Sequence, residues 1–269
     1  MPFQPISLGS SVASVVTADL VIQATTGPCP RKIRPVPDAR VTGLLSSDGV
    51  KLAAWLVQRG KPRGTVVLAH GYRDDRRQLM GLAPALLARG YRVLAFDFRA
   101  HGESDGDRIT LGITETRDVT GVLQFARSFE QPVYYVGFSM GAAAYLLGSE
   151  RADAAILDSP YDTLRVAVEE RLRTFGAPRA VRDEVFRRSE SLFGGPVDAF
   201  RPVDEAAKLT HPSMFVFCSG DFWVRKSARR AFARVLPSSA RYVEVLGMGH
   251  SRHFTRRWID RVVSFVESV

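Results

Sequence analysis

Residues 133–141, VYYVGFSMG, decide the fold. The stretch opens with an apolar run of strand length and leads into 140–149, whose small apolar residues are typical of a helix. Gly137 and Gly141 allow a tight turn that a side chain would obstruct. Ser139, between this strand and the N-terminus of the helix, lies beside N–H groups that favour developing negative charge. Ser139 is therefore the first candidate for a nucleophile.

Strands and helices alternate on both sides of this stretch. Runs of strand length at 41–45 and 51–58 flank the hairpin turn Ser46-Ser47-Asp48-Gly49. Further runs of strand length occur at 65–69, 91–96, 154–157, 213–218 and 241–246, and helical patterns occur at 78–89, 114–129, 226–235 and 254–266. The alternation predicts an α/β fold with a mostly parallel sheet of about eight strands and helices on both faces.

Two segments interrupt this alternation. Residues 1–40 form an N-terminal extension, with a modest helix at 11–24 and a linker at 27–40 that contains four prolines. We expect one domain over 41–269. About 55 residues separate the strands at 154–157 and 213–218, and they are helical and polar with glycine and proline breaks. We expect a small helical cap here, at about 160–210.

Composition excludes several classes of protein. The 269-residue chain is 45% hydrophobic, which suffices for a packed core and excludes a disordered chain. Two cysteines exclude a disulfide scaffold, and their surroundings lack the spacing of a zinc site. The sequence contains no run of about 18 apolar residues, so it predicts no transmembrane helix. Residues 1–27 make a poor signal peptide. We therefore expect a cytoplasmic protein.

The net charge of +9 raises the question of a nucleic-acid or membrane partner. Most basic residues are interleaved with acidic ones, which is typical of a solvated mixed surface. Residues 225–234 are less mixed, with five Lys or Arg side chains and no acid. We expect no nucleic-acid partner, and the sequence does not define an oligomeric state.

The chain resembles the α/β-hydrolase superfamily, and most closely its branch of serine esterases and serine aminopeptidases. Residues 137–141 match the nucleophile elbow of that family. His70-Gly71-Tyr72 follows the strand at 65–69, where the family has its oxyanion loop. Residues 97–104, DFRAHGES, resemble the motif D-x-R-G-H-G-x-S, with Ala100 in place of a glycine. Ala142 also replaces a glycine that is common after the elbow. The resemblance covers 41–269 and implies the α/β-hydrolase fold.

A serine hydroxyl needs a base to become nucleophilic. His250 follows the last strand in the sequence Gly-Met-Gly-His, and the family has its catalytic histidine in that loop, so the resemblance implies His250 as the base. His253 is the alternative. We expect structural roles for His70, His101 and His211.

The base in turn needs a carboxylate that fixes its orientation. Asp221 follows the strand at 213–218, and the order Ser139, Asp221, His250 is the order of the family. Asp158, at the end of the strand 154–157, is the alternative because some relatives carry the acid there.

An oxyanion hole requires two N–H donors. The resemblance implies the backbone N–H groups of Met140 and Tyr72. Nothing in the sequence points to a metal or a cofactor. Arg73 and Arg225 are close enough in sequence to the site to meet an acidic substrate, although either can be a plain surface charge. Apolar and aromatic residues of the same loops are candidates for the substrate pocket, namely Phe138, Tyr161, Phe222, Trp223 and Met248.

These residues predict a serine hydrolase that cleaves carboxylic esters of short to medium acyl chain through an acyl-enzyme. A thioesterase, a lactonase or an aminopeptidase-type amidase would use the same triad and remains an alternative. A non-catalytic scaffold that binds a partner through its basic surface is an alternative of another class.

Overall fold

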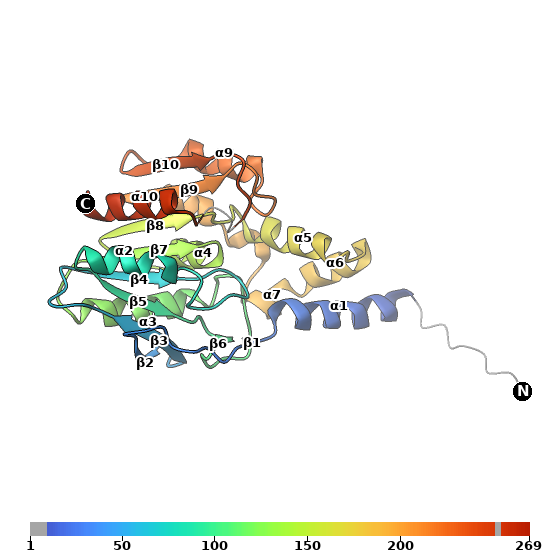
Figure 1. Ribbon diagram of the computed structural model, residues 1–269. Coiled ribbons are helices and arrows are strands. Elements are labelled where there is room, and N and C mark those ends of the chain that lie inside the picture. Colours follow the sequence, from blue (N-terminus) through green and yellow to red (C-terminus); the bar gives the residue numbers. More distant parts are fainter. Residues whose placement is uncertain (1–9, 251–253) are drawn as a thin grey trace, which may run out of the picture.

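The computed structural model describes residues 10–250 and 254–269, with side chains described from Ala18 onward. One eight-stranded sheet crosses the molecule in the order β10-β9-β8-β7-β4-β5-β3-β2 (Figure 1). In this sheet β3 alone runs opposite to the other strands, so its pairings with β2 and β5 are antiparallel and the remaining pairings are parallel. The strands are β2 (Arg40–Leu45), β3 (Lys51–Val57), β4 (Thr65–Ala69), β5 (Arg92–Phe96), β7 (Val133–Phe138), β8 (Ala154–Asp158), β9 (Ser213–Cys218) and β10 (Ala240–Val245). The predicted α/β-hydrolase fold is confirmed.

The five central strands are buried along their whole length, as expected for continuous apolar runs in a parallel sheet. The edge strands β2 and β10 are partly exposed. The predicted hairpin joins β2 to β3, and Gly49 in its turn has a φ of 86°, which suits glycine. The carboxyl ends of β4, β7, β8 and β9 thus come together at one edge of the sheet.

Helices cover both faces of the sheet. Helices α3, α4, α8 and α9 bury apolar side chains against one face, and α2 and α10 cover the other. Pro84 in the first turn of α2 explains why this helix is shorter than the predicted helix at 78–89. The helices are η1 (Met80–Leu82), α2 (Ala83–Ala88), α3 (Thr116–Arg127), α4 (Met140–Leu147), α8 (Pro202–Ala206), α9 (Lys226–Val235) and α10 (Arg256–Glu267).

A third apolar cluster lies beyond the end of the sheet, and most of its residues come from the segment between β8 and β9. It is formed by α5 (Leu164–Thr174), α6 (Arg179–Arg187), α7 (Ser189–Phe193) and η2 (Val197–Ala199) together with α1 (Ser10–Thr26). Figure 1 shows α1 extending alongside α6 and α7, away from the sheet. Ala18 of α1 is fully buried in this cluster. The N-terminal helix therefore packs against the cap, which consists of the helices between β8 and β9, whereas the sequence left its packing partner open.

The C-terminal turn of α1 is fixed to the loop after β4. The Tyr72 hydroxyl donates to the carbonyl of Thr25 at 2.7 Å, and Nη1 of Arg73 donates to the carbonyl of Ala24 at 2.8 Å. The last carbonyls of a helix have no partner within the helix, so these bonds satisfy them. The linker after α1 adds a two-residue strand, β1 (Cys29–Pro30), which pairs with β6 (His101–Gly102) and was not predicted.

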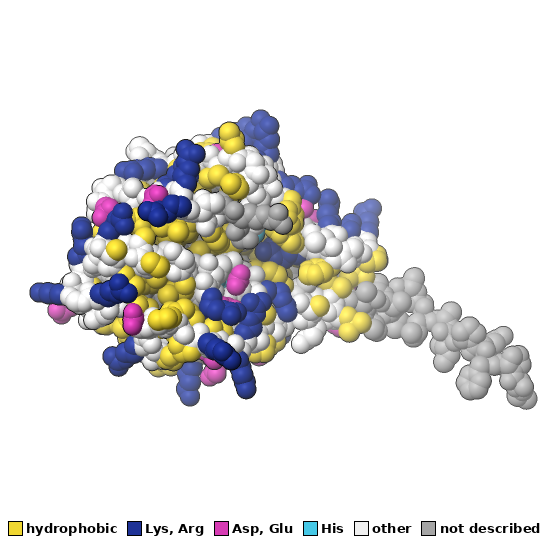
Figure 2. Space-filling view, viewed as in Figure 1, with side chains coloured by type: hydrophobic (Ala, Val, Ile, Leu, Met, Phe, Trp, Pro, Cys, Tyr) yellow, Lys and Arg dark blue, Asp and Glu magenta, His cyan; other side chains and the backbone are white. Residues whose placement is uncertain are grey.

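Basic side chains are spread over the surface. Figure 2 shows Lys and Arg scattered among apolar and acidic side chains on the visible face. In the less mixed stretch 225–234, Arg225 pairs with Glu170 and Arg229 pairs with Glu244. None of the helices in the described parts of the chain combines the length and apolar character needed to cross a membrane.

Candidate active site

Ser139 joins the end of β7 to the start of α4 in a strained turn. Its φ and ψ are 50° and −109°, a backbone conformation that residues other than glycine rarely adopt. A Cβ on Gly141 would lie 2.6 Å from the carbonyl oxygen of Ala69, and one on Gly137 would lie 2.9 Å from the amide nitrogen of Ala142. Gly141 therefore lets α4 approach β4 closely, and Gly137 lets α4 fold back closely on β7. The turn presents Ser139 at the carboxyl edge of the sheet.

The structure brings Ser139, His250 and Asp221 together from three separate loops. Nε2 of His250 is 3.1 Å from Oγ of Ser139, and Nδ1 of His250 is 2.6 Å from Oδ2 of Asp221. The side chain of Asp221 is inaccessible to solvent, and that of His250 is 15% exposed. A neutral imidazole that donates from Nδ1 to a carboxylate has its Nε2 lone pair directed at the serine hydroxyl, which is the arrangement of a base.

Backbone hydrogen bonds hold the loops after β9 and β10 in the positions that bring Asp221 and His250 together. The N–H of Gly220 donates to the carbonyl of Met248 at 3.0 Å. Oδ1 of Asp221 accepts from the N–H groups of Trp223 and Val224 at 2.8 and 3.1 Å. One oxygen of Asp221 is thus fixed by its own loop, which leaves the other directed at His250.

The two alternatives for acid and base differ in their surroundings. The carboxylate of Asp158 accepts from Nε1 of Trp258 at 2.8 Å and from Oγ of Ser159 at 2.9 Å. Nδ1 of His250 faces Asp221 instead. His253 lies outside the described residues.

Two further histidines cross-link the loops beneath the site. Nδ1 of His70 faces its neighbour's carbonyl at 2.7 Å, and Nε2 accepts from the N–H of Phe98 at 3.0 Å. His101 faces the carbonyl of Arg99 in the same way and accepts from the N–H of Arg73 at 3.1 Å. Burial lowers the pKa of His70 to about 4 and that of His101 to about 3, so both rings are neutral. Their bonds are structural, as the sequence predicted.

His211 also has a structural setting. Its Nε2 is 2.8 Å from the hydroxyl of Tyr145, on the helix that follows the elbow. Burial lowers the pKa of His211 as well.

The predicted oxyanion donors flank the serine. The N–H groups of Tyr72 and Met140 take part in no hydrogen bond within the described part of the chain. Gly71 packs closely against the aromatic ring before the serine, because a Cβ there would lie 2.9 Å from Cδ1 of Phe138. Its own N–H donates to Oε1 of Gln78 at 2.7 Å, which fixes the loop.

A cavity of about 210 Å³ opens onto these groups. This volume is below the range of about 300–1,000 Å³ that is typical of pockets for drug-sized ligands. Two of the predicted pocket residues, Phe138 and Trp223, line it. The remaining lining residues are Gly71, Tyr72, Asp74, Gln78, Ser139, Arg171 and His250.

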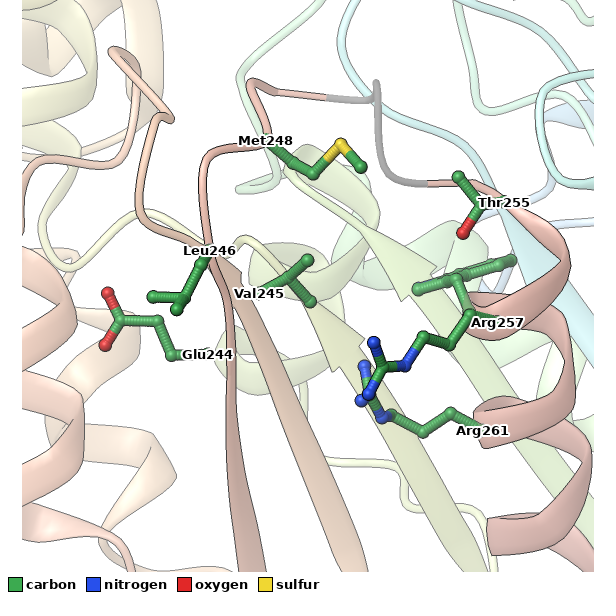
Figure 3. A pocket seen from close by; sticks show the side chains of 8 residues that line it. Glu244, Val245, Leu246, Met248, Thr255, Arg257 and Arg261 are labelled. Carbon is green, nitrogen blue, oxygen red and sulfur yellow. The ribbon is translucent and has the colours of Figure 1, made fainter.

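Three predicted pocket residues do not line this cavity. Tyr161 is buried in the cap cluster, where its hydroxyl donates to the carbonyl of Leu111 at 2.8 Å. Phe222 is 62% exposed. Met248 lines a separate cavity between the end of β10 and the start of α10, where Figure 3 shows its side chain opposite Thr255. Their loops lie near the site as expected, but their side chains point elsewhere.

Sequence reasoning missed Asp74, Gln78 and Arg171. Arg171 lies on the apolar stripe of α5 and is 9% exposed. The sequence signal that could have revealed it is a charged residue at a position of the helix where the apolar spacing predicts burial. The sequence offered two other arginines as partners for an acidic substrate, and both have other partners. Arg73 donates to the carbonyl of Ala24, and Arg225 donates to the carboxylate of Glu170. Within residues 10–250 and 254–269, no three His, Cys, Asp or Glu side chains gather where they could hold a metal ion.

A family model described as Alpha/beta hydrolase family matches residues 66–265. The chain belongs to this family. The match includes the loop after β4, the elbow and the loops that carry Asp221 and His250. The assignment therefore applies to the parts of this alpha/beta hydrolase that form its candidate site.

This alpha/beta hydrolase is similar to several known proteins. An uncharacterized protein of Mycobacterium tuberculosis is 24% identical over 238 residues, which cover 86% of this chain and 79% of the relative. Human monoglyceride lipase is 29% identical over 128 residues, 45% of this chain and 42% of the lipase. An esterase of Pyrococcus furiosus has the same fold, with a TM-score of 0.70 and 24% identity over 90% of this chain and 98% of the esterase.

Proposed function

We propose that this protein is a serine hydrolase that cleaves carboxylic esters of short to medium acyl chain. The observation that carries the proposal is the pair of contacts at His250, 3.1 Å to Oγ of Ser139 and 2.6 Å to Oδ2 of Asp221. The small volume of the cavity favours a short acyl chain. Similarity to a monoglyceride lipase and to an esterase supports ester cleavage.

Acylation begins when Oγ of Ser139 attacks the carbonyl carbon and Nε2 of His250 takes its proton. The imidazolium is stabilised by Asp221. The oxyanion of the tetrahedral intermediate accepts hydrogen bonds from the N–H groups of Tyr72 and Met140. The C–O bond to the alcohol then breaks, and His250 gives its proton to the leaving oxygen.

Deacylation repeats these steps with water. His250 removes a proton from a water molecule, which attacks the acyl-enzyme, and the second tetrahedral intermediate releases the acid and returns the proton to Ser139. A thioester, a lactone or an N-terminal amide would pass through the same intermediates, so these substrates are alternatives for the same residues. No observation of the structure favours one of them.

The test is hydrolysis of p-nitrophenyl esters from acetate to decanoate, with wild type beside Ser139→Ala. We expect turnover that is highest for a short acyl chain and absent in the variant. A fluorophosphonate probe, which labels only an activated serine, should label wild type at Ser139 and leave the variant unlabelled. Substantial turnover by purified Ser139→Ala contradicts the proposal.

Labelling of wild type without turnover would direct the search to thioesters, lactones and amides. Absence of both labelling and turnover would favour the non-catalytic scaffold.

A further inference from the structure

Arg171 lines the same cavity as Ser139 and His250, although it belongs to helix α5 of the cap. Its guanidinium makes one hydrogen bond within the described residues, from Nη1 to the carbonyl of Ala167 at 2.8 Å. Nε is buried and has no partner there. Arginine has five N–H donors, so most of the hydrogen-bonding capacity of this side chain is unused.

No carboxylate in the described part of the chain lies within ion-pair distance of Arg171. Its sequence neighbour Glu170 pairs with Arg225. Asp74, the acidic residue that lines the cavity, accepts from Nε2 of Gln78 at 2.7 Å. Burying a charge without a counter-charge is costly, because a low dielectric disfavours the charged form. Desolvation accordingly lowers the pKa of Arg171 below its ordinary value.

Aromatic rings hold the guanidinium in place. The Cζ atom of Arg171 is 4.9 Å from the ring centroid of Tyr72 and 5.3 Å from that of Trp223. Both rings line the cavity, and the backbone N–H of Tyr72 is a proposed oxyanion donor. Cation–π contacts compensate part of the desolvation but supply no hydrogen-bond acceptor. The cationic group is thus held in the wall of the cavity, and most of its N–H donors have no partner among the described residues.

We propose that Arg171 determines specificity by binding a carboxylate group of the substrate, so that this enzyme prefers esters that carry an anionic carboxylate close to the scissile bond. A guanidinium matches the planar carboxylate through charge and paired donors. The inference rests on the proposed ester hydrolysis at Ser139 and adds the substrate class. The carboxylate can belong to the acyl or to the alcohol part of the ester, and the test has one arm for each.

In the acyl arm, p-nitrophenyl hemiglutarate is compared with p-nitrophenyl valerate, which has a methyl group in place of the carboxylate. In the alcohol arm, 4-(butyryloxy)butanoate is compared with butyl butyrate in a pH-stat. The measured quantity is the ratio of kcat/KM for the anionic ester to that for the neutral ester. Rates with Ser139→Ala are subtracted as the background.

In one arm at least, we expect wild type to prefer the anionic ester by about tenfold or more, the lower end of what hydrogen bonds to a charged group contribute. Arg171→Met should reduce this ratio about tenfold, and Arg171→Lys should restore part of it. The matched control is Arg173→Met, which removes an exposed arginine from the same helix. It should keep the wild-type ratio, because long-range charge alone is screened at the surface.

A wild-type ratio of one or less in both arms overturns the inference, and this result needs no variant to fold. An unchanged ratio in folded Arg171→Met, checked by thermal unfolding, also overturns it. Hydrolysis of the neutral esters in these cases leaves the proposed function intact. If wild type cleaves no ester and its serine is not labelled by fluorophosphonate, the proposed function and this inference fail together.

Discussion

Nδ1 of His250 and Oδ2 of Asp221 are 2.6 Å apart, and the aspartate side chain is fully shielded from solvent. The other carboxylate oxygen accepts two backbone N–H groups of its own loop. Asp221 therefore cannot rotate without losing those bonds. This fixed acceptor selects the tautomer of His250 that carries its proton on Nδ1 and leaves Nε2 free to act as a base.

Asp221→Asn should lower kcat by about 10³- to 10⁴-fold, because an amide can donate to Nδ1 and favours the wrong tautomer. The measurement is kcat for p-nitrophenyl butyrate. Asp158→Asn is the control, since that carboxylate bonds to Trp258 and Ser159, and it should change kcat by less than about tenfold. Equal losses in the two variants would contradict the assignment of Asp221.

Gly141→Ala should destabilise the protein by about 2 kcal/mol or more, because the new Cβ would lie 2.6 Å from the carbonyl oxygen of Ala69 and 2.8 Å from that of His70. Both atoms belong to the backbone at the end of β4 and cannot rotate away. The matched control is Gly81→Ala, where a Cβ would meet nothing within 4 Å. Urea unfolding of both variants is the measurement, and equal stabilities would show that the elbow tolerates a side chain.

The fold and the proximity of Ser139, Asp221 and His250 could be predicted because their determinants are local. A short apolar run and two glycines specify the turn at Ser139, and parallel strands bring the loops after their carboxyl ends to one edge. Asp221 and His250 each follow a strand within a few residues. Their meeting point depends on strand order, which the family resemblance supplied.

The lining of the cavity could not be predicted in the same way. Met248 and Phe222 lie in the expected loops, but the direction of a side chain depends on packing against distant elements. Arg171 comes from the cap, whose apolar side chains pack in one cluster with Ala18 of α1 and Ala143 of α4. No pattern within one helix specifies which neighbour its buried face will meet.

Acid should weaken the fold through His70. Its pKa is about 4 in the folded chain and near 6.5 when unfolded, so below pH 6.5 the unfolded state binds a proton that the native state excludes. Its contribution to stability is complete above pH 6.5 and is lost as the pH falls toward 4. The difference in free energy of unfolding between wild type and His70→Asn should therefore shrink by about 2 kcal/mol from pH 7.5 to pH 5. A difference that stays constant over this range would contradict the lowered pKa.

Docking of α1 should depend on Ala18. This residue is fully buried in the cap cluster, whereas Leu20 on the same helix is 68% exposed. Ala18→Asp would bury a carboxylate in apolar surroundings, which favours detachment of the helix. Leu20→Asp is the matched control, because its carboxylate would remain in water. Hydrogen–deuterium exchange of residues 18–26 should accelerate at least about tenfold in the first variant only.

Detachment of α1 should also lower the activity of the candidate site. The carbonyl of Thr25 accepts from the hydroxyl of Tyr72, and that of Ala24 accepts from Arg73, so the end of α1 holds the loop that carries a proposed oxyanion donor. Ala18→Asp should therefore lower kcat for p-nitrophenyl butyrate, since small displacements of a donor weaken its bond to the oxyanion. Faster exchange in α1 without any change in kcat would show that the loop keeps its shape without the helix. Equal exchange in the two variants would instead contradict the burial of Ala18.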